Sequence, residues 1–224
     1  MRLLLISSSN VHGYGYLDHA EPTLRSFVGD ARKIAFVPFA KNDHAAYIAK
    51  VRERLARMNM IVAGPESVGE AEAIFVGGGN TFRLLKALYD RNLLSLIRER
   101  ARSGIPYIGS SAGSVIAAPT MRTTNDMPIV EPPSFDALGL VSFQLNCHYL
   151  DADPQSSHQG ETREERILEF HEENARPVVG LREGTMLRVE DASVTLVGER
   201  TARIFRRGES AVEAEPGPIE ALLA

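Results

Sequence analysis

One serine of the chain stands in a pattern that suits nucleophilic catalysis. Gly109-x-Ser111-x-Gly113 matches the G-x-S-x-G motif, in which the serine occupies a sharp turn between a strand and a helix. The segment before it (PYI) suits a strand, and the segment after it (SVIAA) suits a helix. The two glycines leave room for the strained backbone of such a turn. Ser111 is therefore the predicted nucleophile rather than Ser110 or Ser114, with an ordinary Gly/Ser loop as the alternative.

A serine nucleophile needs a base to take its proton and an acid to orient that base. His148 follows an apolar run (LVSFQLN) at the point where a strand is expected to end, which is where parallel sheets present catalytic groups. We predict His148 as the base. Solvated or locally bonded side chains account for most of the other five histidines, which lie in polar or helical segments: His12, His19, His44, His158 and His171.

Two carboxylates are candidates for the orienting acid. Asp126 lies in a polar turn (TTNDMPIV) and gives the chain order Ser, Asp, His. Glu183 follows a strand-like segment (VVGL) and gives the order Ser, His, Glu. A structural role is the alternative for each, an Asx turn for Asp126 and an exposed hairpin charge for Glu183. The residues alone leave the acid open.

A glycine-rich turn lies at residues 77–81 (GGGNT), between a strand-like segment (AIFV) and a helical one (FRLLKALYD). Successive glycines let backbone N–H groups approach a ligand, and a helix N-terminus adds a positive field. The turn suits a phosphate, or it suits the oxyanion of acyl transfer if an N–H near Gly79 joins that of Ala112. Because no phosphate-binding or dinucleotide fingerprint is present, we favour the oxyanion hole.

A capping box of Thr162 and Glu165 predicts a helix that begins near residue 163. Arg163 then falls in the first turn, where a cation is mildly unfavourable. Another use of the guanidinium, such as bidentate binding of a substrate carboxylate, is one interpretation, but the residues alone favour the alternative that follows. A surface arginine paired with a neighbouring glutamate is the alternative.

The elements that position these residues follow an α/β pattern. Alternation of short apolar runs with helical patterns predicts βαβ crossovers and a mostly parallel sheet flanked by helices. After about residue 176 the runs shorten and alternate between Gly, Asp and Glu, which predicts C-terminal antiparallel hairpins. Without a linker, we expect one domain over residues 1–224. The apolar runs lie at residues 2–7, 33–39, 59–64, 72–78 and 105–110.

Composition excludes several classes of protein. The 224 residues carry a formal net charge of −4 and no long basic tract, so a nucleic-acid partner is not expected. No apolar run reaches the roughly 18 residues of a membrane span, and no segment resembles a signal peptide, which favours a cytoplasmic protein. A single cysteine excludes an internal disulfide and a multi-cysteine zinc site.

Several of these segments, taken together, resemble the peptidase E (aspartyl dipeptidase) family of serine peptidases. The match extends over nearly the whole chain and includes "VGGGNTF", "RTTNDMPIV", "FDALGL" and "GETREERI". That family is related in fold to class I glutamine amidotransferases and cyanophycinases. The resemblance therefore implies a flavodoxin-like, class I glutamine amidotransferase-like sheet with a nucleophile elbow.

The resemblance implies a serine exopeptidase that hydrolyses Asp-Xaa dipeptides without a cofactor or a metal. Ser111 matches the nucleophile, and His148 matches the general base. Asp126 matches the acid usually assigned in the family, whereas Glu183 matches the acid that cyanophycinase-like relatives use. Both acids are kept, with Asp126 preferred.

Further roles are implied for the substrate site. Gly79 and Ala112 match the oxyanion donors, and Asn80 is expected to contact substrate. Arg163, together with Glu161, falls on the segment that the family uses near the pocket for aspartate. The expected partner is a small peptide, and the resemblance is compatible with a homodimer, for which the sequence carries no interface signal.

Two departures concern the pocket shape. Ser110 stands where a familiar family member has tryptophan, and Cys147 stands where that member has proline, so strict selectivity for aspartate is open to change. The alternatives to an Asp-Xaa dipeptidase are a cyanophycinase-like or isoaspartyl peptidase, or a non-catalytic module that binds a small anion on the same scaffold.

Overall fold

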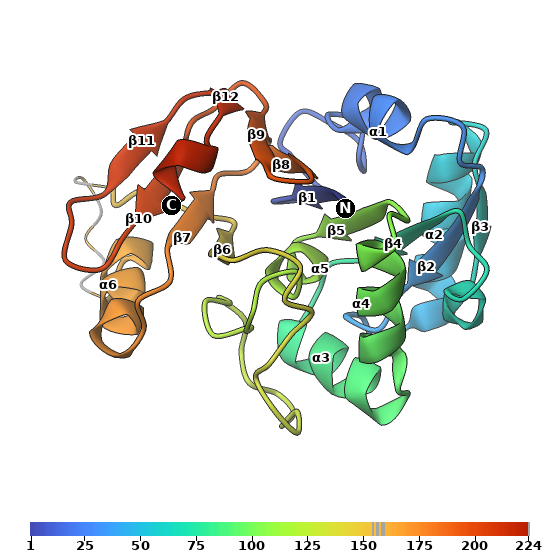
Figure 1. Cartoon of the computed structure of the whole chain (residues 1–224), viewed down its shortest axis with the longest axis horizontal. Helices are drawn as coiled ribbons and strands as arrows, with labels where there is room; N and C mark the ends of the chain where they lie inside the picture. Colours follow the sequence, from blue (N-terminus) through green and yellow to red (C-terminus); the bar gives the residue numbers. More distant parts are fainter. Residues whose placement is uncertain (154, 156, 158–159, 224) are drawn as a thin grey trace.

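An eight-stranded mixed sheet forms the centre of the protein in a computed structural model that describes residues 1–153, 155, 157 and 160–223 (Figure 1). His158 lies outside the described residues. The strand order is β12-β9-β8-β1-β5-β4-β2-β3. Five strands run parallel and coincide with the predicted apolar runs: β1 (Arg2–Ile6), β2 (Lys33–Val37), β3 (Ile61–Ala63), β4 (Ala73–Val76) and β5 (Tyr107–Ser110).

Burial on both faces explains why these strands read as continuous apolar runs. Leu3 and Leu5 belong to one hydrophobic cluster, and Leu4 and Ile6 belong to another, as expected from side chains that alternate between the faces of a sheet. Helices α1 (Glu21–Val28) and α2 (His44–Ala56) pack into the second cluster. Helices α3 (Thr81–Asp90) and α4 (Leu93–Arg102) pack into the first. The predicted helix-flanked sheet is confirmed.

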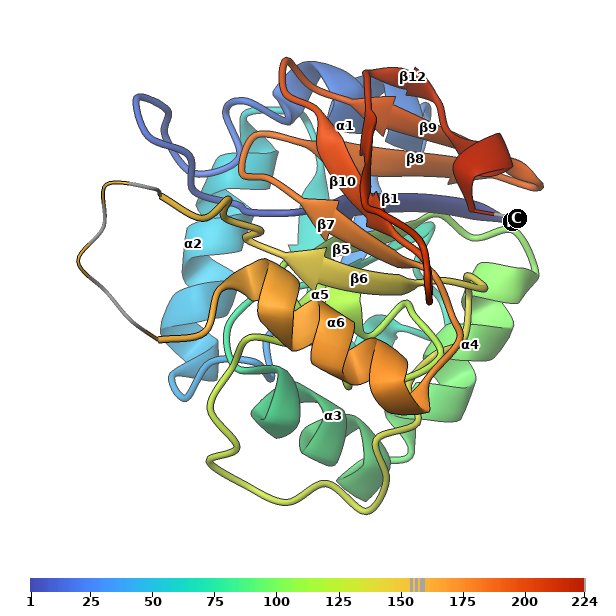
Figure 2. The same cartoon turned by 90° about the vertical axis from the view of Figure 1, so that its left-hand side faces the viewer.

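A second sheet of four strands, in the order β11-β10-β7-β6, lies beside the first. Strands β6 (Gln144–Cys147) and β7 (Val178–Leu181) are parallel, because α6 (Arg163–Glu173) connects them as a crossover and covers the sheet (Figure 2). Strands β10 (Ala202–Phe205) and β11 (Val212–Ala214) pair antiparallel.

The predicted C-terminal hairpins are therefore divided between two sheets. Strands β8 (Met186–Glu190) and β9 (Ser193–Val197) form an antiparallel hairpin that extends the main sheet from β1, with β12 (Gly217–Pro218) at its edge. Single helical turns complete the described elements: α5 (Ala112–Val115), η1 (Pro65–Ser67) and η2 (Glu220–Leu222). In the part of the chain that is described, no helix has the length and apolar character needed to cross a bilayer.

The carboxyl ends of strands from both sheets carry the residues of interest. Ser111 directly follows β5, His148 directly follows β6, and Glu183 follows β7 by two residues. The glycine-rich turn follows β4 in the same way. Ligands gather at such strand ends in open α/β sheets, which makes this edge the candidate site.

Candidate active site

Ser111 occupies the sharp turn between β5 and α5. Its backbone has φ 51° and ψ −112°, a conformation that costs a residue with a side chain about 1–3 kcal/mol. The neighbouring glycines permit the turn to pack: a Cβ on Gly113 would collide with the carbonyl oxygen of Val76, and one on Gly109 would lie 2.6 Å from the backbone of Gly113. The N–H of Ser111 donates to the carbonyl of Ile6 at 2.9 Å, which ties the turn to β1.

A continuous hydrogen-bond chain connects Ser111, His148 and Glu183. The hydroxyl of Ser111 lies 2.8 Å from Nε2 of His148, and Nδ1 of His148 lies 2.7 Å from Oε1 of Glu183. When Nδ1 carries the proton and donates it to Glu183, Nε2 is free to accept from Ser111. This is the geometry of a serine activated by a histidine whose tautomer a carboxylate fixes.

The backbone around His148 is fixed by the hydroxyl of Ser7, which follows β1 and is fully buried. The hydroxyl accepts from the N–H of His148 at 3.0 Å and donates to the carbonyl of Leu181 at 2.8 Å. His148 itself has φ 56°, in the left-handed region that few residues with side chains adopt. Ser7 thereby joins the segment that carries His148 to the strand that precedes Glu183.

Asp126 makes its contacts elsewhere. Its Oδ2 accepts from the N–H and the hydroxyl of Thr81 at 2.7 and 2.6 Å, and from the hydroxyl of Thr124 at 3.1 Å. The first N–H groups of a helix attract a carboxylate, and Thr81 begins α3. Asp126 thus contacts Thr81 and Thr124, whereas Glu183 contacts His148, so the geometry supports Glu183 over Asp126 as the candidate acid, and the assignment stays a prediction.

The glycine-rich turn lies against the turn at residues 109–113 that carries Ser111, called the nucleophile turn below. A Cβ on Gly78 would lie 2.9 Å from Cβ of Ser111, and Gly79 has φ 139° with the carbonyl of Ala40 directly over its open face. Ala112 is the first residue of α5, where an N–H has no partner within the helix. The close approach of the two turns agrees with shared oxyanion binding by Gly79 and Ala112, which stays a prediction.

A cavity of about 690 Å³ opens over the Ser111–His148 pair. Its volume falls in the range of small-molecule sites. Three cationic side chains contribute to its wall, Lys41, Lys50 and Arg83, none of which was predicted as a site residue. They come from the segment after β2, from α2 and from α3, so only the fold brings them together.

The predicted substrate residues divide between this cavity and a second groove. Asn80 lines the cavity, but its side chain caps α3 by accepting from the N–H of Arg83 at 3.0 Å, and it donates to the carbonyl of Met127 at 2.8 Å. Arg163 and Glu161 line a separate groove of about 550 Å³.

Arg163 is linked to the residue before His148 through one intermediary, Asn125. Its Nη1 donates to the side-chain oxygen of Asn125 at 2.9 Å, and the amide of Asn125 donates to the carbonyl of Cys147, the residue before His148, at 2.9 Å. Burial, with the nearby charge of Arg166, lowers the pKa of the Arg163 guanidinium. Glu161 pairs with Arg166 at 3.3 Å.

The two departures noted in the sequence are both buried. Ser110 has no exposed surface and does not line the cavity, so the expectation that it shapes the pocket is wrong. It belongs to β5, one residue before the turn, where its side chain points into the protein. Cys147 is also buried, which raises the pKa of its thiol to about 12 and disfavours the thiolate.

Comparison with known proteins gives the family. The sequence model of Peptidase family S51 matches residues 3–197 of the chain. "Peptidase E" of Streptomyces coelicolor is 55% identical, with 97% of this chain and 92% of the relative covered. The "Probable alpha-aspartyl dipeptidase" of Drosophila melanogaster is 47% identical, with 96% and 93% covered.

A solved structure supports the fold separately. A peptidase from an acI-B1 actinobacterium superposes with a TM-score of 0.70 at 17% identity, covering 96% of this chain and 95% of the other. The sequence-based resemblance to peptidase E is confirmed by these matches over nearly the full length. The chain therefore belongs to peptidase family S51.

Proposed function

We propose that this protein is a serine dipeptidase that hydrolyses Asp-Xaa dipeptides, with Ser111 as nucleophile, His148 as general base and Glu183 as the orienting acid. The observation that carries the proposal is the unbroken hydrogen-bond chain from Ser111 through His148 to Glu183. Membership of family S51, and relatives named peptidase E and alpha-aspartyl dipeptidase, support the reaction class and the substrate.

The mechanism follows from the partners of the two ring nitrogens of His148. His148 takes the proton of Ser111 through Nε2 as the serine oxygen attacks the scissile carbonyl, and later gives that proton to the leaving amine. Glu183 accepts the hydrogen bond from the Nδ1–H of His148 throughout and stabilises the imidazolium. The resulting aspartyl ester is hydrolysed by water, with His148 acting again as base.

The negative charge of the tetrahedral intermediate needs donors beside the nucleophile. We assign this role to the backbone N–H groups of Gly79 and Ala112, supported by the contact between Gly78 and Ser111. Such fixed dipoles cost no reorganisation during the reaction, and the loss of one donor typically costs about 10²–10³ in kcat.

The cationic side chains near the site suit a substrate with two carboxylates, the aspartate side chain and the free C-terminus of a dipeptide. Arg163, with Glu161 beside it, is assigned to the aspartate end of the substrate, and Asn80 contributes to the wall of the cavity. The cationic wall of Lys41, Lys50 and Arg83 suits the free carboxylate of the second residue, which a dipeptide brings close to the scissile bond and a longer peptide does not. A cytoplasmic location and a homodimer remain predictions from the sequence.

A dipeptide panel tests the proposal. Purified protein is assayed on Asp-Leu, Glu-Leu, Ala-Leu and β-linked Asp-Leu, together with the Ser111→Ala variant. Preferential cleavage of Asp-Leu that depends on Ser111 supports an aspartyl dipeptidase. Preference for the β-linked peptide would instead indicate an isoaspartyl or cyanophycinase-like enzyme. No cleavage of any peptide would favour a non-catalytic module that binds a small anion.

A further inference from the structure

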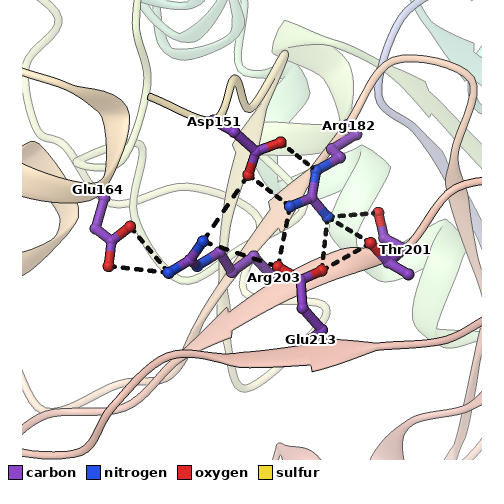
Figure 3. A network of polar contacts seen from close by, with 6 residues as sticks. All are labelled: Asp151, Glu164, Arg182, Thr201, Arg203 and Glu213. Atoms are coloured by element: carbon purple, nitrogen blue, oxygen red, sulfur yellow. Dashed lines mark hydrogen bonds and ion pairs between the residues drawn. The ribbon is translucent and has the colours of Figure 1, made fainter. Parts of the chain in front are cut away.

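A dense polar network surrounds Arg182, the residue before Glu183 (Figure 3). Nε and Nη2 of Arg182 donate to the two oxygens of Asp151 at 2.8 and 2.6 Å. Nη1 and Nη2 donate to the two oxygens of Glu213 at 2.8 and 3.0 Å. Nη1 also donates to the carbonyl and the hydroxyl of Thr201 at 3.0 and 2.6 Å. The guanidinium thus has partners along every edge of its plane.

The arginine and the two carboxylates of this network remain ionised. Only 7% of the Arg182 side chain is exposed, and Asp151 and Glu213 are each 45% exposed. Hydrogen bonds from Arg182 lower the pKa of both carboxyls, and the two carboxylates raise the pKa of the guanidinium. Bidentate pairs of this kind fix direction as well as distance, which a lysine does not reproduce.

The network joins the two segments that carry the proposed base and acid. Asp151 lies three residues after His148, and Arg182 immediately precedes Glu183. Closer to the strands, the N–H of Tyr149 donates to the carbonyl of Leu181 at 3.0 Å. The two segments are therefore connected by backbone at the strand ends, through the hydroxyl of Ser7, and by the Arg182–Asp151 pair further out.

The side chains of His148 and Glu183 need such support. They are 39% and 40% exposed and lie in turns beyond the ends of β6 and β7, so neither is held by surrounding core. Rotation or drift of either turn lengthens the 2.7 Å contact between Nδ1 and Oε1. A displacement of about 1 Å in a catalytic group can cost on the order of 10²-fold in rate.

We infer that Arg182 is a positioning residue that holds Glu183 against His148 by clamping the Glu183 turn to Asp151 and Glu213. The inference rests on the proposed function of the Ser111–His148–Glu183 chain. Arg182 acts through Glu183, since its own donors are all engaged with Asp151, Glu213 and Thr201.

The test compares two arginines that are equally buried. Arg182→Lys keeps the positive charge and removes the bidentate geometry. Arg54→Lys is the matched control, because Arg54 is also 7% exposed and also pairs with two carboxylates, Asp18 and Glu21, at 2.9 and 2.6 Å. Values of kcat and KM for Asp-Leu are measured per folded molecule, with the folded fraction taken from circular dichroism.

Arg182→Lys is expected to lower kcat by about tenfold or more with KM changed by less than about twofold, as for a misplaced group that acts in the transition state. Arg54→Lys is expected to leave kcat within about twofold of the parent enzyme. Equal loss of kcat in both variants would show that the effect is not specific to the Arg182 clamp, and no loss in Arg182→Lys would show that Arg182 positions nothing. Either result overturns the inference.

The pH profile gives a readout that a structural role would not move. When Glu183 drifts from His148, the imidazolium loses stabilisation, and the acidic limb of kcat/KM moves to lower pH. A further variant, Arg182→Met, removes the positive charge as well as the clamp. Loss of that charge alone would move the acidic limb to higher pH, so the direction of the shift separates the charge effect from drift of Glu183. Other charged and titratable groups near the pair are retained in every variant, namely Asp126, His19, Lys41, Lys50 and Arg83.

A second variant covers the case in which Arg182→Lys fails to fold. Asp151→Asn keeps the volume and weakens the clamp from its other side, so the same fall in kcat with little change in KM is expected. Unchanged values in a folded Asp151→Asn would contradict the inference. If the parent enzyme cleaves no dipeptide, or if Ser111→Ala still cleaves, the proposed function fails and this inference fails with it. If cleavage depends on Ser111 but kcat is unchanged in Arg182→Lys and Asp151→Asn, only this inference is refuted.

Discussion

Oε1 of Glu183 lies 2.7 Å from Nδ1 of His148, although the two residues are 35 positions apart in the chain. The other ring nitrogen faces the hydroxyl of Ser111. Because β6 and β7 are parallel neighbours, the turns that follow them emerge at the same edge of the second sheet, and this edge faces the nucleophile turn of the main sheet. The site is therefore assembled where the two sheets meet.

The nucleophile can be identified by covalent labelling. A serine-directed phosphonate is expected to label the parent protein and Ser110→Ala, and to leave Ser111→Ala unlabelled, as read by intact mass. Ser110 is the matched control because its hydroxyl is buried without a hydrogen-bond partner among the described residues, so its removal costs little stability. Labelling of Ser111→Ala would assign the nucleophile elsewhere.

The Ser7 bridge is expected to matter for both stability and rate. Ser7→Ala leaves the N–H of His148 and the carbonyl of Leu181 without their shared partner, which costs about 1–3 kcal/mol of unfolding free energy. It also releases the backbone of His148, so kcat falls beyond what the folded fraction explains.

A second buried hydroxyl serves as the control for Ser7. Thr123 donates to the carbonyl of Leu145 at 2.8 Å and does not contact His148, so Thr123→Val is expected to lose stability while keeping kcat per folded molecule. Urea denaturation and steady-state kinetics measure the two effects. A Ser7→Ala enzyme with normal kcat would show that the bridge only stabilises the fold.

The nucleophile turn is expected to reject any side chain at position 113. Gly113→Ala drives a Cβ into the carbonyl of Val76 in the adjacent β4, so the turn or the strand must shift. We expect a loss of about 2 kcal/mol or more and a large fall in activity. Gly69→Ala, which meets no atom within 4 Å, should keep the melting temperature; equal effects of the two substitutions would contradict the packing argument.

Selection of aspartate is expected to depend on Arg163. Arg163→Gln removes the charge and keeps a polar side chain that can still reach Asn125, its present partner. We expect kcat/KM for Asp-Leu to fall by about tenfold or more, as for loss of a charge-assisted hydrogen bond, and kcat/KM for Ala-Leu to change little. A parallel fall for both substrates would mean that Arg163 supports the structure around Asn125 instead of reading the substrate.

The strands, the nucleophile turn and the position of His148 could be predicted because each depends on a local pattern. Continuous apolar runs mark strands buried on both faces, and the Gly-Ser-Gly spacing reports the strain of one turn. His148 was recognisable because it directly follows such a run. These features need no knowledge of what lies next to them in space.

The choice between Asp126 and Glu183 depends on contacts that no local pattern records. Asp126 is held by the first residue of α3, Thr81, which is 45 positions away. Glu183 reaches His148 because β7 pairs with β6, whereas a succession of antiparallel hairpins was expected from this part of the sequence. The cationic wall was missed for the same reason, since its three residues come from three separate elements.

The most direct measurement is the kcat of Glu183→Gln beside that of Asp126→Asn on Asp-Leu, each corrected for folded protein. Glu183→Gln should reduce kcat at least about tenfold more than Asp126→Asn, since disabling the acid of a serine triad costs up to about 10⁴. Asp126→Asn should mainly weaken the N-terminus of α3. A larger loss of kcat in Asp126→Asn, or equal small losses in both, would contradict the assignment of Glu183 as the acid that orients His148.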